Sequence, residues 1–138
     1  MATPLITAFA AHLKRWQAQP FVFGTADCVA FTVDWIDTQR GTHFTARVER
    51  EWRTRPFRDL RMLAEPGKLR AAVEAVLGPP DEGAQSKLGD VVMFRTPDDK
   101  EAIGVAGERL VYGPSEHGIA AVAQTGRLTA VWPLEWIS

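Results

Sequence analysis

The sequence predicts an α+β domain in which N-terminal helices pack on a C-terminal antiparallel sheet. Up to about residue 78, apolar residues recur at the three- and four-residue spacing of helices, whereas from about residue 88 they fall in short segments rich in valine and isoleucine. With 138 residues, of which 46% are hydrophobic, the chain is long enough for one ordinary core. We therefore expect a single domain over residues 1–138, helical over about 4–78 and a sheet over about 88–133.

The first helix is expected to start at Pro4, with Thr3 as its N-cap, and to end before Pro20. Its apolar residues recur at spacings of four, four and three, as an amphipathic helix requires: Leu5, Phe9, Leu13 and Trp16. His12 is assigned to the polar side of this helix, facing solvent.

A second helix is expected over about residues 27–40. Thr25 or Asp27 is its N-cap, which places Cys28 in the first turn. An arginine and a glycine at 40–41 supply a basic last turn and a glycine just past the end. Apolar residues occur nearly all round it, as in a helix covered on several sides: Val29, Ala30, Phe31, Val33, Trp35 and Ile36.

The segment 47–61 contains six arginines and is open to three interpretations. It is a solvated face balanced by the acidic residues of 98–101, or a protein interface, because arginine and tryptophan are enriched at interface centres. Binding to nucleic acid or anionic cell-wall polymers is the third, and the net charge does not support it. The residues concerned are Arg47, Arg50, Arg53, Arg55, Arg58 and Arg61, with Trp52 and Phe57 between them.

The rest of the chain divides at a proline-rich linker. A short helix is expected from Pro56 to residue 64 and another over 69–77, which Gly78-Pro79-Pro80 ends. Five strands of an antiparallel meander follow, with the clearest hairpin turn at Gly107-Glu108 and the helices covering one face. The expected strands are 91–94, 102–106, 110–112, 119–123 and 129–132.

Composition excludes several classes of function. The formal charge of −1 gives no overall attraction to nucleic acid or to an anionic membrane. One cysteine excludes an internal disulfide and a cysteine-based zinc site, and three widely spaced histidines argue against a metal centre. No apolar run approaches the ~20 residues of a membrane span, and the N-terminus lacks the layout of a secretory signal. We expect no cofactor, no metal, no nucleic-acid partner and no membrane insertion.

Cys28 is the candidate nucleophile. Unpaired N–H groups and the helix dipole stabilise a thiolate in the first turn of a helix. The alternative is that this lone cysteine is a small buried hydrophobic side chain. On position alone, the second interpretation is the more common one.

Two segments resemble motifs of the NlpC/P60 family of papain-like cysteine peptidases, many of which cut the stem peptides of bacterial cell walls. Phe21-Val22-Phe23-Gly24 followed by Asp27-Cys28 resembles its nucleophile segment, and Leu88-Gly89-Asp90-Val91-Val92-Met93-Phe94 resembles the first strand of its sheet. The run Asp27, Cys28, Phe31 and Trp35, with Val131-Trp132 near the end, is similar to an NlpC/P60-like group from phage tail genes. The resemblance implies a papain-like fold, a place in the virion tail tip, and hub and distal tail proteins as partners.

The sequence departs from that family at the catalytic positions. Where active members begin the second strand with the catalytic histidine, this chain has Ala102, and Tyr112 is the candidate for the third polar residue. Phe21 replaces the family's tyrosine and Val29-Ala30 replaces its Ser-Gly. Each change removes a polar group or fills space at the expected site.

A cysteine nucleophile needs a base within hydrogen-bond reach. Of the remaining histidines, His43 follows the far end of the second helix, about 20 Å from Cys28 at ~1.5 Å per residue. His117 follows a turn before a strand, and a bend of the sheet would bring it near Cys28. Cys28 and His117 are therefore the candidate catalytic pair, and Asp27 is assigned to capping.

Three functions follow. The first is a tail-tip, hub-associated structural component with a degenerate peptidase site. The second is an active cysteine peptidase or amidase that opens peptidoglycan during DNA entry, and the third is a non-catalytic binding module that uses the arginine-rich face. On the first interpretation the protein is made in the bacterial cytoplasm without a signal peptide and leaves it in the particle.

Overall fold

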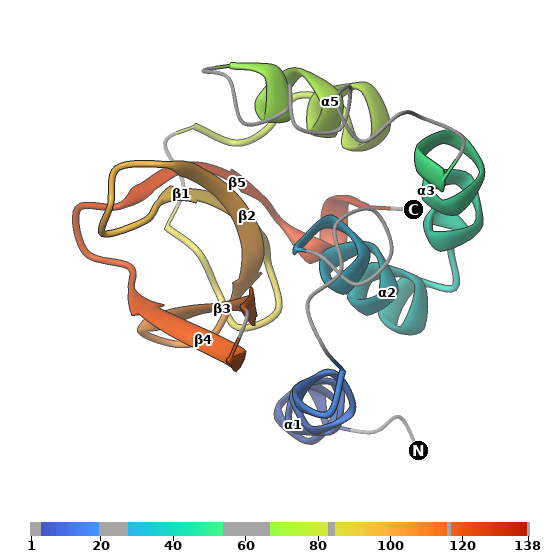
Figure 1. Cartoon of the computed structure of the whole chain (residues 1–138), viewed down its shortest axis with the longest axis horizontal. Coiled ribbons are helices and arrows are strands. Elements are labelled where there is room, and N and C mark those ends of the chain that lie inside the picture. The colour runs from blue at the N-terminus through green and yellow to red at the C-terminus, as the bar shows by residue number, and fades with distance from the viewer. Residues whose placement is uncertain (1–3, 20–27, 54–66, 83–84, 116, 138) are drawn as a thin grey trace.

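A computed structural model describes residues 4–19, 28–53, 67–82, 85–115 and 117–137 (Figure 1). The helices it contains are α1 (Leu5–Gln17), α2 (Cys28–Arg40), α3 (Phe44–Arg53), α5 (Lys68–Leu77) and the short 3₁₀ helix η2 (Leu134–Trp136). The strands are β1 (Val91–Arg95), β2 (Glu101–Ala106), β3 (Leu110–Ser115), β4 (Gly118–Ala123) and β5 (Leu128–Trp132). This order of helices followed by strands confirms the predicted α+β class.

The five strands form one antiparallel sheet in the order β4-β3-β2-β1-β5. The expected meander holds for β1 to β4, but β5 returns to the other edge of β1, where Trp132 lies opposite Val91. On the other side of β1, Val91 lies opposite Val105 of β2. The position of β1 between β2 and β5, with apolar clusters on both faces, explains why its residues from Val91 to Phe94 are all buried.

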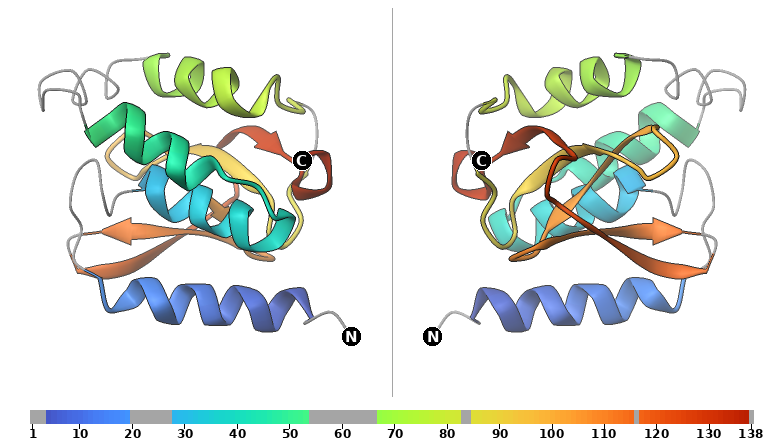
Figure 2. Two further views of the ribbon diagram at one scale, coloured as in Figure 1. Left: turned by 90° about the vertical axis from the view of Figure 1, so that its right-hand side faces the viewer. Right: turned by 90° about the vertical axis from the view of Figure 1, so that its left-hand side faces the viewer.

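The helices pack on one face of the sheet, as predicted. Successive side chains of a strand point to opposite faces. Val91 and Met93 pack in the core shared with α2, α3 and α5, together with Ile36, Val48, Val73 and Trp132. A second cluster joins α1 to α2 and the sheet through Phe9, Trp16, Phe31, Trp35 and Val105. Figure 2 shows α1 and α5 at opposite ends of the molecule, with α2 and the sheet between them.

The other face of the sheet is covered by the sheet's own curled strands. The strands curl, as Figure 1 shows, and enclose a third apolar cluster. It is formed by Val92, Phe94, Ala106, Val111 and Val131. Gly104 allows β2 to lie close to β3, because a Cβ atom at Gly104 would lie 2.5 Å from the carbonyl oxygen of Tyr112.

The helical half of the chain agrees with the sequence patterns, with three corrections. The helix α1 starts at Leu5 with Pro4 as its N-cap, one residue later than predicted, and Thr3 lies outside the described residues. The whole of α3 was not predicted, while the short helix expected from Pro56 falls outside the described residues. Gly41 and Gly78, with φ of 68° and 82°, follow the last residues of α2 and α5 as expected.

The third correction concerns His12, which is buried with 1% of its surface exposed. It follows Phe9 by three residues and precedes Trp16 by four, so all three share one face of α1. That face packs on α2, with the His12 ring 4.5 Å from the Phe31 ring between centroids. The prediction that His12 faces solvent is therefore wrong.

Candidate functional site

Cys28 is the first residue of α2 and is half-buried. Its carbonyl accepts a 2.7 Å hydrogen bond from the Thr32 hydroxyl one turn later. The helix N-terminus places positive partial charge beside the thiol, which favours the thiolate. Thr25 and Asp27, the candidate caps, lie outside the described residues. Cys28 thus has the position in the fold that the nucleophile prediction requires.

Cys28 lines a cavity of about 250 Å³ between the start of α2 and the sheet. Ala102 and Ile103 of β2 line the same cavity, as does Ser115 at the end of β3. Two hydroxyl groups contribute to the lining, and both are engaged: Ser115 Oγ donates to the Gly118 carbonyl at 2.8 Å, and Thr96 Oγ1 donates to Asp98 at 2.5 Å. Cys28 is the one ionisable side chain among the described residues of this lining.

The structure therefore brings Cys28 and Ala102 together, and places the remaining candidates elsewhere. His117 is exposed in the turn between β3 and β4, where its backbone N–H donates to Ser115 Oγ at 3.2 Å. It is not one of the described residues that line the Cys28 cavity. Tyr112 points to the α1 side, where its ring meets Phe9 edge-on at 5.3 Å. His43 is exposed between α2 and α3.

The Gly-Asp motif before β1 has a structural role. Gly89 adopts φ of 93° and its carbonyl accepts a 2.8 Å hydrogen bond from the Trp35 indole. The buried carboxylate of Asp90 accepts hydrogen bonds from the backbone N–H of Lys87 at 2.8 Å and of Leu134 at 3.0 Å. These contacts fix the start of β1 to α2 and η2, so the motif positions the sheet and supplies no group to the Cys28 cavity.

A partly buried cluster of polar side chains that sequence reasoning missed lies between α1 and α2. Asp34 accepts 2.8 Å hydrogen bonds from Arg15 and from the Trp16 indole, and lies 3.6 Å from His12 Nδ1. Burial lowers the pKa of His12 to about 4, against the opposing attraction of Asp34. Burial favours a raised pKa for Asp34, but the hydrogen bonds from Trp16 and Arg15 outweigh it and hold that pKa below its ordinary value. His12 is therefore neutral at neutral pH and Asp34 is ionised.

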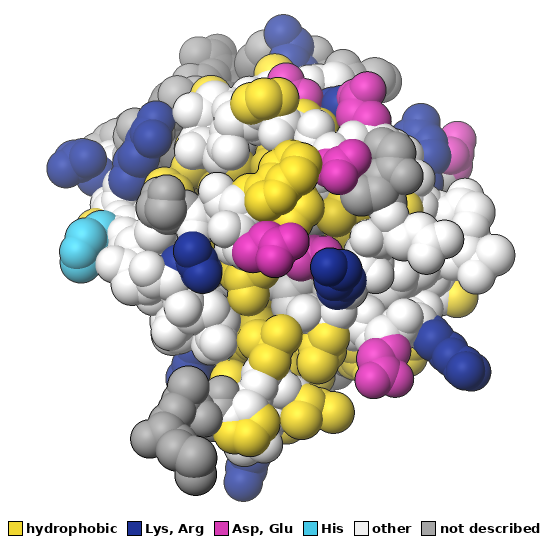
Figure 3. Space-filling view, turned by 180° about the vertical axis from the view of Figure 1, so that it is seen from behind, with side chains coloured by type: hydrophobic (Ala, Val, Ile, Leu, Met, Phe, Trp, Pro, Cys, Tyr) yellow, Lys and Arg dark blue, Asp and Glu magenta, His cyan; other side chains and the backbone are white. Residues whose placement is uncertain are grey.

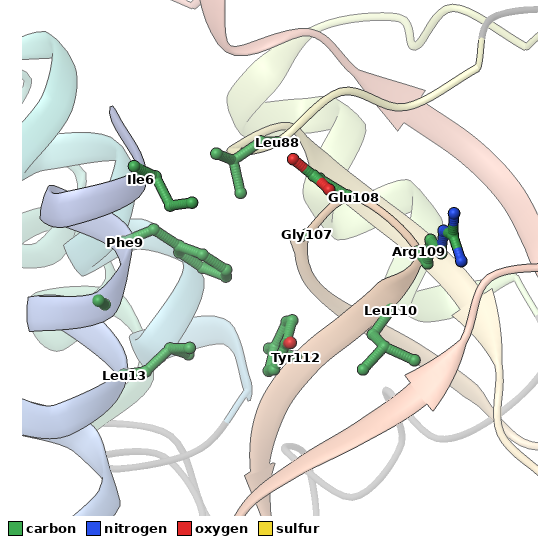
Figure 4. A pocket seen from close by; sticks show the side chains of 10 residues that line it. Ile6, Phe9, Leu13, Leu88, Gly107, Glu108, Arg109, Leu110 and Tyr112 are labelled. Atoms are coloured by element: carbon green, nitrogen blue, oxygen red, sulfur yellow. The ribbon is translucent and has the colours of Figure 1, made fainter. Parts of the chain in front are cut away.

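A second cavity, of about 380 Å³, lies between α1 and the β2–β3 hairpin (Figure 4). Ile6, Phe9 and Leu13 of α1 form one wall, and Leu88, Leu110 and Tyr112 form the other. Glu108 and Arg109 at the hairpin tip contribute its charged groups. Of the candidate catalytic residues, Tyr112 lines this second cavity, whereas Cys28 and His117 are not among its described lining residues.

The arginine-rich segment is described only in part. Arg50 is exposed on α3 and Arg47 is half-buried there, while Arg55, Arg58 and Arg61 lie outside the described residues.

Within the described ranges, no three His, Cys, Asp or Glu side chains are grouped so that they would hold a metal ion. Similarly, none of the helices described has the length and apolar character needed to cross a bilayer.

Comparison with known proteins identifies a matching family. Residues 5–134 match a family described as a domain of unknown function, DUF6950. No curated protein matches the sequence. Since the match extends over nearly all of the helices and the whole sheet, the chain belongs to the DUF6950 family.

Proposed function

We propose that the protein is a phage or prophage tail-tip component, associated with hub and distal tail proteins, that has an NlpC/P60-like, papain-related fold with a degenerate cysteine-peptidase site. The observation that supports this most directly is the shared cavity of Cys28 and Ala102. In active members of the resembled family, the position of Ala102 is occupied by the catalytic histidine. A methyl group there neither accepts the thiol proton nor donates one to a leaving amine.

The surroundings of Cys28 support the same proposal. The described lining is largely apolar, and its two hydroxyl groups donate to other protein oxygens. None of the described lining residues is a histidine, so this lining supplies no imidazolium of the kind that holds a catalytic thiolate at low pH. The helix N-terminus alone lowers a thiol pKa modestly from about 8.5.

The test measures the rate of alkylation of Cys28 by iodoacetamide against pH, which a single cysteine makes specific. We expect the wild-type rate to follow the titration of an ordinary or modestly acidified thiol. Ala102→His would restore an imidazole to the cavity, and we expect it to extend fast alkylation to lower pH by at least about one unit. Ala121→His, on the exposed side of β4, is the matched control and should leave the wild-type profile unchanged.

The alternative is an active peptidoglycan peptidase or amidase with Cys28 as nucleophile and His117 as base. One observation favours it: Ser115 lines the cavity and is bonded to the backbone of His117, so the turn lies near the cavity rim. Fast wild-type alkylation at pH 5 that is lost in His117→Ala, together with cleavage of muropeptides by the pure protein, would establish this alternative and reject the degenerate site.

The place in the tail tip needs its own experiment. The protein is co-expressed with the hub and distal tail proteins of the phage or prophage that carries its gene, and the mixture is separated by size-exclusion chromatography. We expect a stable complex, and we expect the protein in purified particles by mass spectrometry. A protein that elutes alone and is missing from particles would contradict the proposal, whatever the reactivity of Cys28.

A further inference from the structure

The cavity between α1 and the β2–β3 hairpin opens on an unusually apolar part of the surface. Four large hydrophobic side chains are exposed among the described residues: Leu5, Ile6, Leu110 and Trp136. Ile6, with 61% of its surface exposed, and Leu110 line the cavity itself. In Figure 4, Ile6, Phe9 and Leu13 point from α1 toward the hairpin.

The other two exposed residues continue the same surface. Leu5 precedes Ile6 and, like Leu134 of η2, lies within 3.5 Å of the position that a Cβ atom of Gly89 would occupy. Trp136, 59% exposed, belongs to the same short helix as Leu134. We call Leu5, Ile6, Leu110, Leu134 and Trp136 the apolar band. Figure 3 shows that one face of the molecule carries a stripe of hydrophobic side chains, with charged side chains among them. Several exposed large apolar side chains around a cavity are typical of protein interaction sites.

The backbone of the hairpin limits what can bind there. The Gln124 side chain donates to the carbonyls of Gly107 and Leu110 at 2.9 and 3.1 Å, and its backbone N–H donates to that of Arg109 at 3.0 Å. A partner strand would find these carbonyls occupied and its own backbone groups unpaired. A helix satisfies its backbone internally and needs only side-chain contacts, so the cavity favours a helix.

The charged groups at the hairpin tip determine which charge on the partner is favoured beside the cavity. In Figure 4 the Glu108 carboxylate lies on the side of the hairpin nearer α1 and Leu88, while Arg109 lies on the side away from α1. Glu108 is exposed and forms no ion pair with any described residue. A basic residue flanking the apolar face of the partner would complement it.

We propose that the apolar band docks an amphipathic helix of another protein, which inserts apolar side chains between α1 and the hairpin and presents a lysine or arginine to Glu108. This proposal concerns a surface distinct from the Cys28 cavity. It therefore stands or falls independently of the degenerate site.

The test uses a fluorescein-labelled, alanine-based peptide of about 18 residues, with leucines at i, i+3, i+4 and i+7 and one lysine beside that face. A peptide of the same composition with the leucines spread around the helix is the probe control. We expect saturable binding of the first peptide by fluorescence anisotropy and none of the second. Equal binding of both would overturn the proposal.

Variants locate the binding surface. Ile6→Lys and Leu110→Lys should each weaken binding at least about tenfold, while Ala71→Lys, exposed on α5 at the opposite end, should not change it. Glu108→Lys should weaken binding about threefold and recover it when the peptide lysine is replaced by glutamate. Unchanged binding in the first two variants would reject the site.

A second copy of the chain is the competing occupant. Sedimentation equilibrium of the protein alone decides this, because the proposal predicts a monomer. A dimer abolished by Ile6→Lys but not by Ala71→Lys would assign the band to self-association and overturn the proposal. Circular dichroism of each variant verifies that the fold is intact.

Discussion

The indole N–H of Trp35 donates a 2.8 Å hydrogen bond to the carbonyl of Gly89, a residue 54 positions later. Trp35 is completely buried in the middle of α2, and Gly89 lies directly before Asp90 and β1. This bond joins the helical half of the chain to the sheet at the point where β1, an inner strand, begins. Since Cys28 lies on the same helix and Ala102 on the neighbouring strand, the bond also helps to set the geometry of their cavity.

Trp35→Phe removes this hydrogen bond and leaves a smaller ring in a closely packed site. We expect the free energy of unfolding to fall by about 2–4 kcal/mol, from the unpaired carbonyl and the cavity together. Urea unfolding at equilibrium measures it. Trp136→Phe, at an exposed position, is the control and should change stability by less than about 0.5 kcal/mol. Similar losses in both variants would contradict the role given to Trp35.

Gly89→Ala tests the backbone at the other end of the same bond. The residue has φ of 93°, and an added Cβ would lie 3.3 Å from side-chain atoms of both Leu5 and Trp35. Gly126, with φ of 73° and nothing within 4 Å, isolates the backbone cost alone. We expect Gly126→Ala to cost about 1 kcal/mol and Gly89→Ala at least about 1 kcal/mol more in thermal unfolding. Equal costs would mean that the packing around Gly89 yields freely.

Local patterns in the sequence predicted the elements better than their arrangement. All five strands lie within a few residues of the predicted segments, because alternation and turn residues are local features. The return of β5 to the edge of β1 depends on pairing between distant segments, and no local pattern encodes it. The shared cavity of Cys28 and Ala102 has the same origin, since it depends on how α2 packs on β2.

Two features of the helical half that were not predicted, the burial of His12 and the helix α3, have a pattern in the sequence that indicates them. His12 lies at helical spacing from Phe9 and Trp16, which indicates the buried face, although its side chain is of a polar type. In α3, Phe44 and Val48 are four residues apart and form an apolar stripe among the arginines. The capping group of α3 comes from the preceding helix, so a search for a local N-cap does not find it.

That group is Asp37, which provides a third prediction. Its carboxylate accepts hydrogen bonds from the backbone N–H of Phe44 at 2.8 Å and of Thr45 at 2.7 Å, at the start of α3. We expect Asp37→Ala to lower the free energy of unfolding by about 1–2 kcal/mol, as loss of an N-cap does. Glu82→Ala removes an exposed ion pair with Arg70 and should cost under about 0.5 kcal/mol. Hydrogen exchange should accelerate at Phe44 and Thr45 in the first variant only; unchanged exchange there would rule out the cap.

The last prediction concerns acid and His12. Its pKa of about 4 in the folded protein lies below the ordinary 6.5, so between these values the unfolded chain binds more protons. The stabilisation is therefore fully present above about pH 6.5 and is lost as the pH falls toward 4. From pH 7 to pH 5 we expect the free energy of unfolding to fall by about 2 kcal/mol because of this one residue.

His12→Leu removes the titration and should flatten the stability profile over pH 5–7, whereas His43→Gln, at an exposed position, should leave the wild-type slope. The lowered pKa of Asp34 places the loss of its own contribution at more acidic pH, where the carboxylate is protonated, so the two groups separate along the pH axis. Urea unfolding at half-unit steps of pH measures both. If the His12→Leu profile is as steep as that of the wild type over pH 5–7, the acid sensitivity originates elsewhere, and His12 is not held neutral by its burial against α2.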